Sequence, residues 1–181
     1  MDRSYGFGIE EEYFLCDALS RGPRRKSARA FLDECRARMG EAVRTEMLQS
    51  QIEVATPPCE TMGEARAVLA ELRQELGALA RNHGLVIVAS GTHPTAVWAH
   101  QRHTEAERYD RLMRDLQMLG TRNMLCGLHV HVAVPCPERR VNLMSRLLPF
   151  VPLLLGLSTS SPFWQGRRTG LLGYRLAAYR E

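Results

Sequence analysis

The chain has 181 residues, of which 45% are hydrophobic and 24% are charged, and its formal net charge is +4. This composition is that of a globular protein and excludes wholesale disorder, and the length suffices for one domain over residues 1–181. The basic excess is too small to require nucleic acid, and the basic residues form no single long block. We therefore expect one globular domain that does not bind nucleic acid.

Three features bear on the compartment. The N-terminus has no apolar signal core. The five cysteines, at positions 16, 35, 59, 126 and 136, are odd in number and show no C-x-x-C spacing, which argues against a disulfide framework or a zinc knuckle and fits a reducing cytoplasm. The longest apolar run, Leu147–Leu157, is about half of a membrane span and contains Pro149 and Pro152. These features predict a soluble cytoplasmic protein with no membrane segment.

Strands and helices are predicted to be mixed along the chain. In order, the pattern predicts a strand at 4–15, a helix at 28–39, a strand at 48–56, a helix from 61 to about 83, a strand at 85–90, a helix at 104–119, a strand at 125–134, and a helix at 138–157 that is kinked at its prolines. Thr61 with Glu64, and Thr104 with Glu107, have capping-box spacing, and Met62 falls on the apolar stripe of its helix. Because strand and helix do not alternate regularly, we expect an α+β fold with a mostly antiparallel sheet and helices packed outside.

Two carboxylates share one face of the first strand. The period of two places Glu10 and Glu12 roughly 7 Å apart along the strand, and Gly6 and Gly8 on the same face leave room for a ligand. Carboxylates at this spacing repel each other unless a positive charge lies between them, and Mg²⁺ prefers oxygen ligands. The alternative interpretation is a strand end with solvated glutamates.

Two further strands carry similar side chains. His129 and His131 share one face of their strand, opposite apolar residues, as in metal-binding strands. Glu53 shares the polar face of another strand with Gln49 and Gln51. The alternatives are a pair of hydrogen-bonded, partly buried histidines and an edge strand whose polar face meets water.

Three separate strands each carry possible metal ligands on one face, and a single shared site explains this better than chance. An oxygen-rich site with one or two histidines fits Mg²⁺ or Mn²⁺ that bridges nucleotide phosphates, and Glu46, just before its strand, is a further candidate. The sequence contains no P-loop, G-x-S-x-G or H-E-x-x-H motif. Cys126 is a candidate nucleophile, but its apolar flanks favour a buried structural thiol.

The whole pattern resembles a known family. The matching strings are FGIEEEYFL, LQSQIEVATPPC, ASGTHP, RYDRLMRDLQMLGTRNMLCGLHVHVAVP and SSPFWQGRRTG. They occur in the same order, from about residue 6 to residue 175, as in the bacterial carboxylate–amine ligases, the family-2 glutamate–cysteine ligase-like proteins. The resemblance therefore covers nearly the whole chain.

The resemblance implies a glutamine-synthetase-like catalytic fold, in which an antiparallel sheet is curved into a funnel with helices outside. It implies that ATP phosphorylates an amino-acid carboxylate and that an amine attacks the acyl phosphate to give an amide. The implied substrates are a glutamate-like acid and an amine such as cysteine, and the implied cofactors are ATP and Mg²⁺ or Mn²⁺. The residues implied as metal ligands are Glu10, Glu12, Glu53 and His129. The residues implied as substrate or nucleotide contacts are Gln49, Gln51, His131, Arg167 and Arg175.

The chain also departs from this family. Its members are usually much longer, their second half supplies further strands and ligands, and Arg168 stands where they generally have an aspartate. We therefore expect a funnel open on one side, exposed apolar sheet and helix surface, and a homo-oligomer. A fragment, a truncated gene and a site completed by another subunit all fit this expectation. Two other functions remain open: a non-catalytic homologue that binds nucleotide or acts as an interaction module, and a metal-dependent hydrolase that uses the histidines and glutamates.

Overall fold

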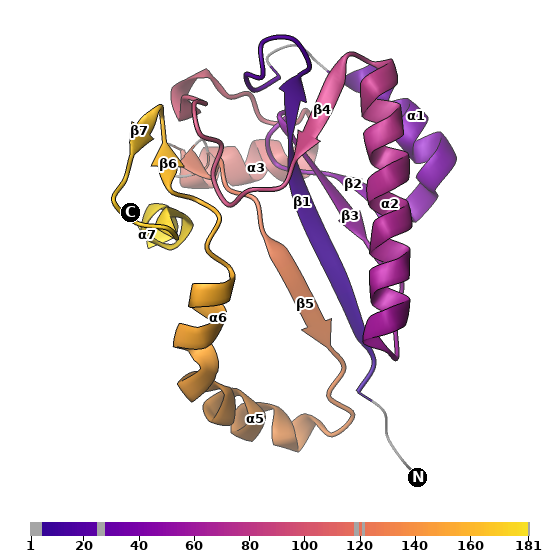
Figure 1. Ribbon diagram of the computed structural model, residues 1–181, viewed down its shortest axis with the longest axis vertical. Helices are drawn as coiled ribbons and strands as arrows, with labels where there is room; N and C mark the ends of the chain where they lie inside the picture. Colours follow the sequence, from indigo (N-terminus) through magenta and orange to yellow (C-terminus); the bar gives the residue numbers. More distant parts are fainter. Residues whose placement is uncertain (1–4, 25–27, 118–119, 121, 181) are drawn as a thin grey trace.

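The computed structural model describes residues 5–24, 28–117, 120 and 122–180. Helices and antiparallel strands are mixed, as predicted (Figure 1). The strands are β1 (Phe7–Asp17), β2 (Val43–Thr45), β3 (Gln51–Ala55), β4 (Leu85–Val88), β5 (Leu128–Val132), β6 (Phe163–Trp164) and β7 (Arg167–Arg168). The α-helices are α1 (Arg29–Met39), α2 (Met62–Asn82), α3 (Glu107–Leu116), α5 (Arg140–Leu147), α6 (Val151–Leu157) and α7 (Tyr174–Arg180). Short 3-10 turns are η1 (Gly40–Ala42), η2 (Trp98–His100), η3 (Pro137–Arg139) and η4 (Leu148–Phe150).

The main sheet is built around the long strand β1. It has the order β2-β3-β1-β4, and β5 also pairs with β1. Along one edge, Glu10–Phe14 of β1 pair with β3. Along the other edge, Phe7–Glu11 pair with β5 and Phe14–Asp17 pair with β4. All of these pairings are antiparallel, so β4 and β5 share one edge of β1 and lie at its opposite ends.

Helices α1 and α2 cover one face of this sheet (Figure 1). The core beneath them joins Leu15 and Ile52 of the sheet to Phe31 of α1 and Leu76 of α2, all at most 1% exposed. The apolar period of each helix matches this contact. The predicted start of α2 is confirmed, since Thr61 accepts a hydrogen bond from the Glu64 backbone N–H. The expectation for Met62 is wrong: it is 70% exposed, whereas Ala65 in the same first turn of α2 is fully buried.

The opposite face of the sheet is covered at one end only. Phe14 and Cys16, which point to this face, are buried against Leu48, Met124 and Cys126. Glu10 and Glu12 lie on the same face of β1, four and two residues before Phe14, and no apolar cluster of the described residues covers them. The open end of this face is therefore the polar end.

Two predicted elements differ in detail. The strand predicted at 48–56 begins only at Gln51, since Leu48 pairs with His103 and the Gln49 N–H donates to the Arg102 carbonyl. The capping box predicted for Thr104 is wrong, because its hydroxyl donates to the Glu46 carbonyl and α3 begins at Glu107. The predicted end of this helix at 119 lies outside the described residues. Strand β2 was not predicted at all.

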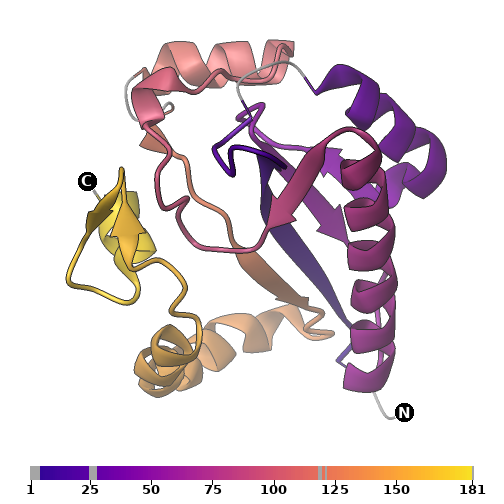
Figure 2. The same cartoon turned by 45° about the horizontal axis from the view of Figure 1, so that its top comes forward.

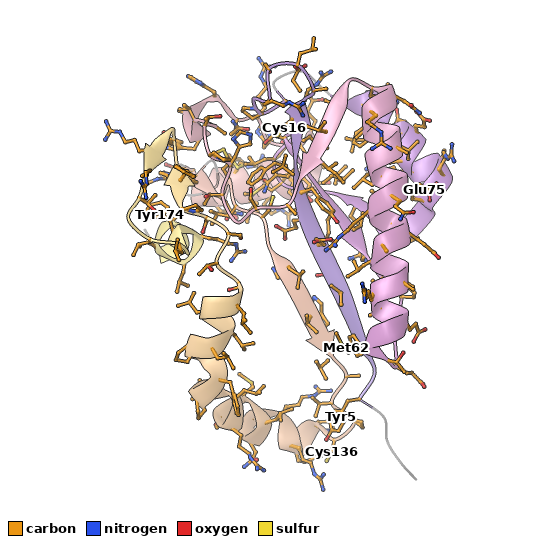
Figure 3. All side chains as sticks on the ribbon, viewed as in Figure 1. Tyr5, Cys16, Met62, Glu75, Cys136 and Tyr174 are labelled. Carbon is orange, nitrogen blue, oxygen red and sulfur yellow. The ribbon has the colours of Figure 1, made fainter. Side chains whose placement is uncertain are left out.

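The chain after β4 and its loops is far less covered. On β5, Leu128, Val130 and Val132 are each more than half exposed. Helices α5 and α6 also expose their apolar residues, whose side chains project from the helix in Figure 3. This matches the exposed apolar sheet and helix surface expected from the shorter length of the chain.

The helix predicted at 138–157 bends near its prolines, as expected, where α5 and α6 meet (Figure 1). Residues 137–157 form a continuous helical run, with the turn at Leu148–Phe150 in 3-10 form. The run has 21 residues and is apolar enough to cross a membrane by length and composition, and none of it is buried. A helix that packs against protein passes the same test, so this run by itself is weak evidence for a membrane.

Candidate metal site

The register of three strands brings the predicted site residues together. Glu10 of β1 lies opposite His129 of β5, and Glu12 of β1 lies opposite Glu53 of β3. Since side chains alternate along a strand, all four point to the open polar face. His131 lies two residues further along β5, on the same face. The groups that the sequence places on three separate strands therefore converge.

One group of possible ligands combines a carboxylate with two imidazoles. Atoms of Glu10, His129 and His131 lie within 4.8 Å of one another. The Nε2 of His131 is 2.7 Å from a carboxylate oxygen of Glu10, and the Nδ1 of His129 is 3.6 Å from the same oxygen. The hydrogen bond from His131 is the largest influence on Glu10 and holds the pKa of that carboxyl below its ordinary value. Both imidazoles are exposed, so they are accessible to an ion from solution.

A second group contains only carboxylates. Atoms of Glu12, Glu46 and Glu53 lie within 4.8 Å of one another. Burial raises the pKa of Glu46 to about 7, and the negative charges of Glu12 and Glu53 add to this rise. Glu12 also accepts a 2.8 Å hydrogen bond from the Gly127 N–H. Three carboxylates held this close repel one another unless one of them is protonated or a cation binds between them.

Arg44 of β2 bridges the two groups. Its guanidinium lies 3.2 Å from a carboxylate oxygen of Glu10 and 3.3 Å from one of Glu53. The guanidinium thus supplies part of the positive charge that the acidic face requires. An open groove of about 640 Å³ is lined by Glu10, Arg44, Glu46 and Glu53, together with Tyr109.

The donor set fits divalent cations. Carboxylate oxygens are the ligands of Mg²⁺ and Mn²⁺, and imidazole adds affinity for Mn²⁺ over Mg²⁺. The all-carboxylate group suits Mg²⁺, and the group with two histidines suits a softer ion. The residues present are therefore compatible with the cofactor that the resemblance implies.

Arg44 is the site residue that sequence reasoning missed. It lies on β2, a strand of three residues, which is too short to show an alternating pattern in the sequence. Glu46 was a weaker candidate for the same reason. Its backbone is held by contacts distant in sequence, since Thr104 donates to its carbonyl and Tyr109 donates to the carbonyl of Thr45. The only signal in the sequence is the R-T-E string just before the predicted strand.

The two glutamines face inward to the protein. The amide of Gln51 donates to the Leu125 carbonyl at 2.6 Å and the side chain is 5% exposed. The amide of Gln49 donates to the His103 carbonyl at 3.0 Å. In this structure both amides hold neighbouring loops against β3.

The two arginines lie in different places. The Nε of Arg175 donates to the Cys126 carbonyl at 2.8 Å, next to Gly127 and the acidic face. A Cβ at Gly127 would come within 2.7 Å of the His129 Nε2 and 3.0 Å of an Arg175 guanidinium nitrogen, so a larger residue here would displace these two side-chain ends. Arg167 lines a separate pocket on the β6–β7 hairpin. The structure thus brings Arg175, and not Arg167, to the edge of the predicted site.

The fold is shared with enzymes of glutathione synthesis. The chain superposes on a bifunctional glutathione synthetase from Pasteurella multocida with a TM-score of 0.60 at 15% identity, over 89% of this chain and 24% of that one. It superposes on a glutamate–cysteine ligase from Francisella tularensis, solved in complex with AMP, with a TM-score of 0.58 at 13% identity, over 81% of this chain and 29% of that one. At these identities the likeness establishes the fold alone.

Sequence comparison gives the family. Residues 6–181 match the model of glutamate-cysteine ligase family 2, and the chain belongs to this family. It is 48% identical to a protein of Bradyrhizobium sp. (strain ORS 278) named "Putative glutamate--cysteine ligase 2", over 98% of this chain and 43% of that protein. A Rhodospirillum rubrum protein of the same name is 43% identical over 97% of this chain and 46% of its own length. The chain thus spans less than half of the length of these relatives.

Proposed function

We propose that this chain carries the metal-binding part of an ATP-dependent carboxylate–amine ligase of the glutamate–cysteine ligase type. The observation that carries the proposal is the convergence of four glutamates and two histidines, from β1, β3, β5 and the loop before β3, on one open face. Membership of a ligase family supports the reaction class. In the proposed reaction a carboxylate oxygen of a glutamate-like acid attacks the terminal phosphorus of ATP and releases ADP. An amine such as that of cysteine then attacks the acyl carbon, and phosphate leaves as the amide bond forms.

Each residue has a role in this proposal. Glu10, Glu12, Glu53 and His129 would hold Mg²⁺ or Mn²⁺, with Glu46 as an added ligand. The bound ions would neutralise the triphosphate, which a face with four carboxylates would otherwise repel. Arg44 keeps these carboxylates together by its ion pairs with Glu10 and Glu53. His131 orients Glu10 through its hydrogen bond. Arg175 is placed to meet an anionic group of substrate or nucleotide, and Gln49 and Gln51 support the loops around the site.

Location and assembly are part of the proposal. All five cysteines are free, as in proteins of a reducing cytoplasm. The exposed apolar residues of β5, α5 and α6 support self-association into a homo-oligomer.

Turnover is the direct test. The purified chain is incubated with ATP, Mg²⁺, glutamate and cysteine, and ADP is measured. We expect ADP release only when both amino acids are present. A folded sample that binds Mg²⁺-ATP in calorimetry but shows no amine-dependent turnover would support the non-catalytic alternative. Purification with tightly bound zinc or iron would favour the metal-dependent hydrolase.

Metal binding tests the site independently of turnover. We expect the Glu53→Gln substitution to weaken Mn²⁺ binding at least ~10-fold, because it removes a charged oxygen ligand while keeping the shape of the side chain. Glu71→Gln, on an exposed position of α2, is the matched control and should leave Mn²⁺ affinity unchanged. Equal affinities of the two variants would place the metal elsewhere.

A further inference from the structure

A second pocket lies on the C-terminal hairpin, away from the acidic face. Strands β6 and β7, the start of α7 and Val97 enclose about 570 Å³, which is in the range that holds small ligands. Trp164, Arg167, Arg168 and Tyr174 are among the residues that line it, and Figure 3 labels Tyr174 beside the hairpin. None of the glutamates or histidines of the metal site lines this pocket. We refer to it as the hairpin pocket.

The hairpin pocket carries the positive charge of its arginines, and no acidic side chain is among its lining residues. Residues 139–180 contain seven arginines and no aspartate or glutamate. Arg167 and Arg168 are both exposed, and within the described part of the chain neither forms an ion pair. Both guanidinium groups line the pocket and make it positive, so a bound anion is favoured there. Guanidinium groups bind phosphate or carboxylate through paired hydrogen bonds.

The hairpin holds these side chains in place. Gln165 and Gly166, at φ of 49° and 79°, form the two-residue turn, so Trp164 lies directly opposite Arg167 on one face of the hairpin. The Gly166 N–H donates to the Pro94 carbonyl at 2.8 Å and anchors the turn to the loop that carries Val97. In both orientations of the ribbon, α7 lies beside the β6–β7 hairpin (Figures 1 and 2).

Two aromatic rings complete the pocket. The rings of Trp164 and Tyr174 have centroids 5.9 Å apart and planes inclined by 46°. Trp164 also packs against the buried cluster of Phe14 and Met124, which fixes its orientation. Aromatic faces of this kind stack on planar rings of a ligand, next to arginines that bind its charged group.

We propose that the hairpin pocket binds a small phosphate ester of a planar ring, such as a nucleoside monophosphate, without a divalent metal. Arg167 and Arg168 bind the phosphate, and Trp164 and Tyr174 contact the ring. This chemistry is the opposite of that on the acidic face, where an anionic ligand needs a bound cation. The inference does not rest on the proposed ligase function, and it gives Arg167 a ligand other than the substrate at the metal site.

Calorimetric titration of the 181-residue chain with AMP, in EDTA, tests the proposal. Adenosine, inorganic phosphate and glutamate serve as separate probes of the ring, the phosphate and a carboxylate. We expect AMP to bind at least ~10-fold more tightly than any of the three, since only AMP engages both the arginines and the rings. Quenching of tryptophan fluorescence should accompany AMP binding.

Paired arginine variants locate the binding site. The double substitution R167A/R168A should weaken AMP binding at least ~10-fold, whereas R139A/R140A, an exposed and adjacent pair where α5 begins, should change it less than about twofold. Equal weakening by both pairs, or no AMP binding in EDTA, would overturn the proposal. Glutamate binding as tight as AMP binding would show a carboxylate site and would also overturn it. The E53Q variant should keep AMP affinity in EDTA, which separates this site from the metal site.

Discussion

Strands β1 and β5 have the same alternating sequence pattern, but the apolar face of β1 is buried and that of β5 is exposed. The apolar residues of β1, such as Ile9, Tyr13 and Leu15, are at most 7% exposed beneath α1 and α2. Val130 of β5, which lies opposite Ile9 and on the same face, is 55% exposed. The same contrast holds for the two regions around them. The region before residue 127 has its own core, whereas from 127 to 178 only Ser161 is buried. An alternating pattern therefore specifies a strand face, but not what covers it.

The largest effect expected from this contrast is on the free energy of unfolding. We expect Phe31→Ala, in the core of the first region, to lower the free energy of unfolding by about 3–5 kcal/mol, because it leaves a cavity in a fully buried cluster. Leu148→Ala in the second region removes an exposed side chain and should cost below about 0.5 kcal/mol. Urea denaturation measures both. Similar losses would mean that the two regions are equally covered in solution.

A buried ion pair sharpens the comparison within the first region. Glu11 points away from the metal site and accepts two hydrogen bonds from Arg73 of α2, at 2.6 and 2.7 Å, and a third from the Tyr13 hydroxyl. Because Glu11 is only 4% exposed, we expect Glu11→Gln to cost about 1.5–3 kcal/mol.

The control for Glu11 is Glu75, which pairs with Arg38 on the surface. Its side chain is 39% exposed, so Glu75→Gln should cost at most about 1 kcal/mol (Figure 3). Denaturation at low and high salt separates the two, since the surface pair is screened more strongly than the pair of the buried Glu11. A Glu11 variant as stable as the Glu75 variant would contradict the role of Glu11 in joining β1 to α2.

Self-association tests the uncovered face directly. We expect Val130→Glu to weaken homo-oligomer formation about 10-fold, because it places a charge in the centre of the exposed apolar stripe of β5. Leu19→Glu, on an isolated side chain that is 95% exposed, should leave the oligomer unchanged. Sedimentation equilibrium measures both. Identical behaviour of the two variants would show that the stripe on β5 is not the contact.

A smaller effect is expected on the pH dependence of stability, through Glu46 at the polar face. The pKa of Glu46 is raised in the folded chain from the ordinary 4.5 to about 7, mainly by burial. Between these two values the folded chain binds more protons than the unfolded chain, so this contribution to stability is lost as pH rises from about 4.5 to 7. We expect the parent chain to lose stability relative to Glu46→Gln over this window in EDTA, because the glutamine side chain stays uncharged. A parent chain that gains stability relative to the variant as pH rises would contradict the raised pKa.

The sequence by itself determined the period-two faces and the family. It placed Glu10 with Glu12, and His129 with His131, on common strand faces, because side-chain direction along a strand depends only on local geometry. It also predicted the start of α2 at Thr61, since a cap depends on four consecutive residues.

Tertiary structure alone decided how these faces combine. The register that puts Glu12 opposite Glu53, and the short strand that brings Arg44 to Glu10, depend on pairings between distant segments. The same holds for Thr104, whose hydroxyl binds the loop of Glu46 in place of a helix cap. The burial of β1 and the exposure of β5 also arise from which helix reaches which strand. Such contacts join residues far apart in the chain, so no local pattern contains them.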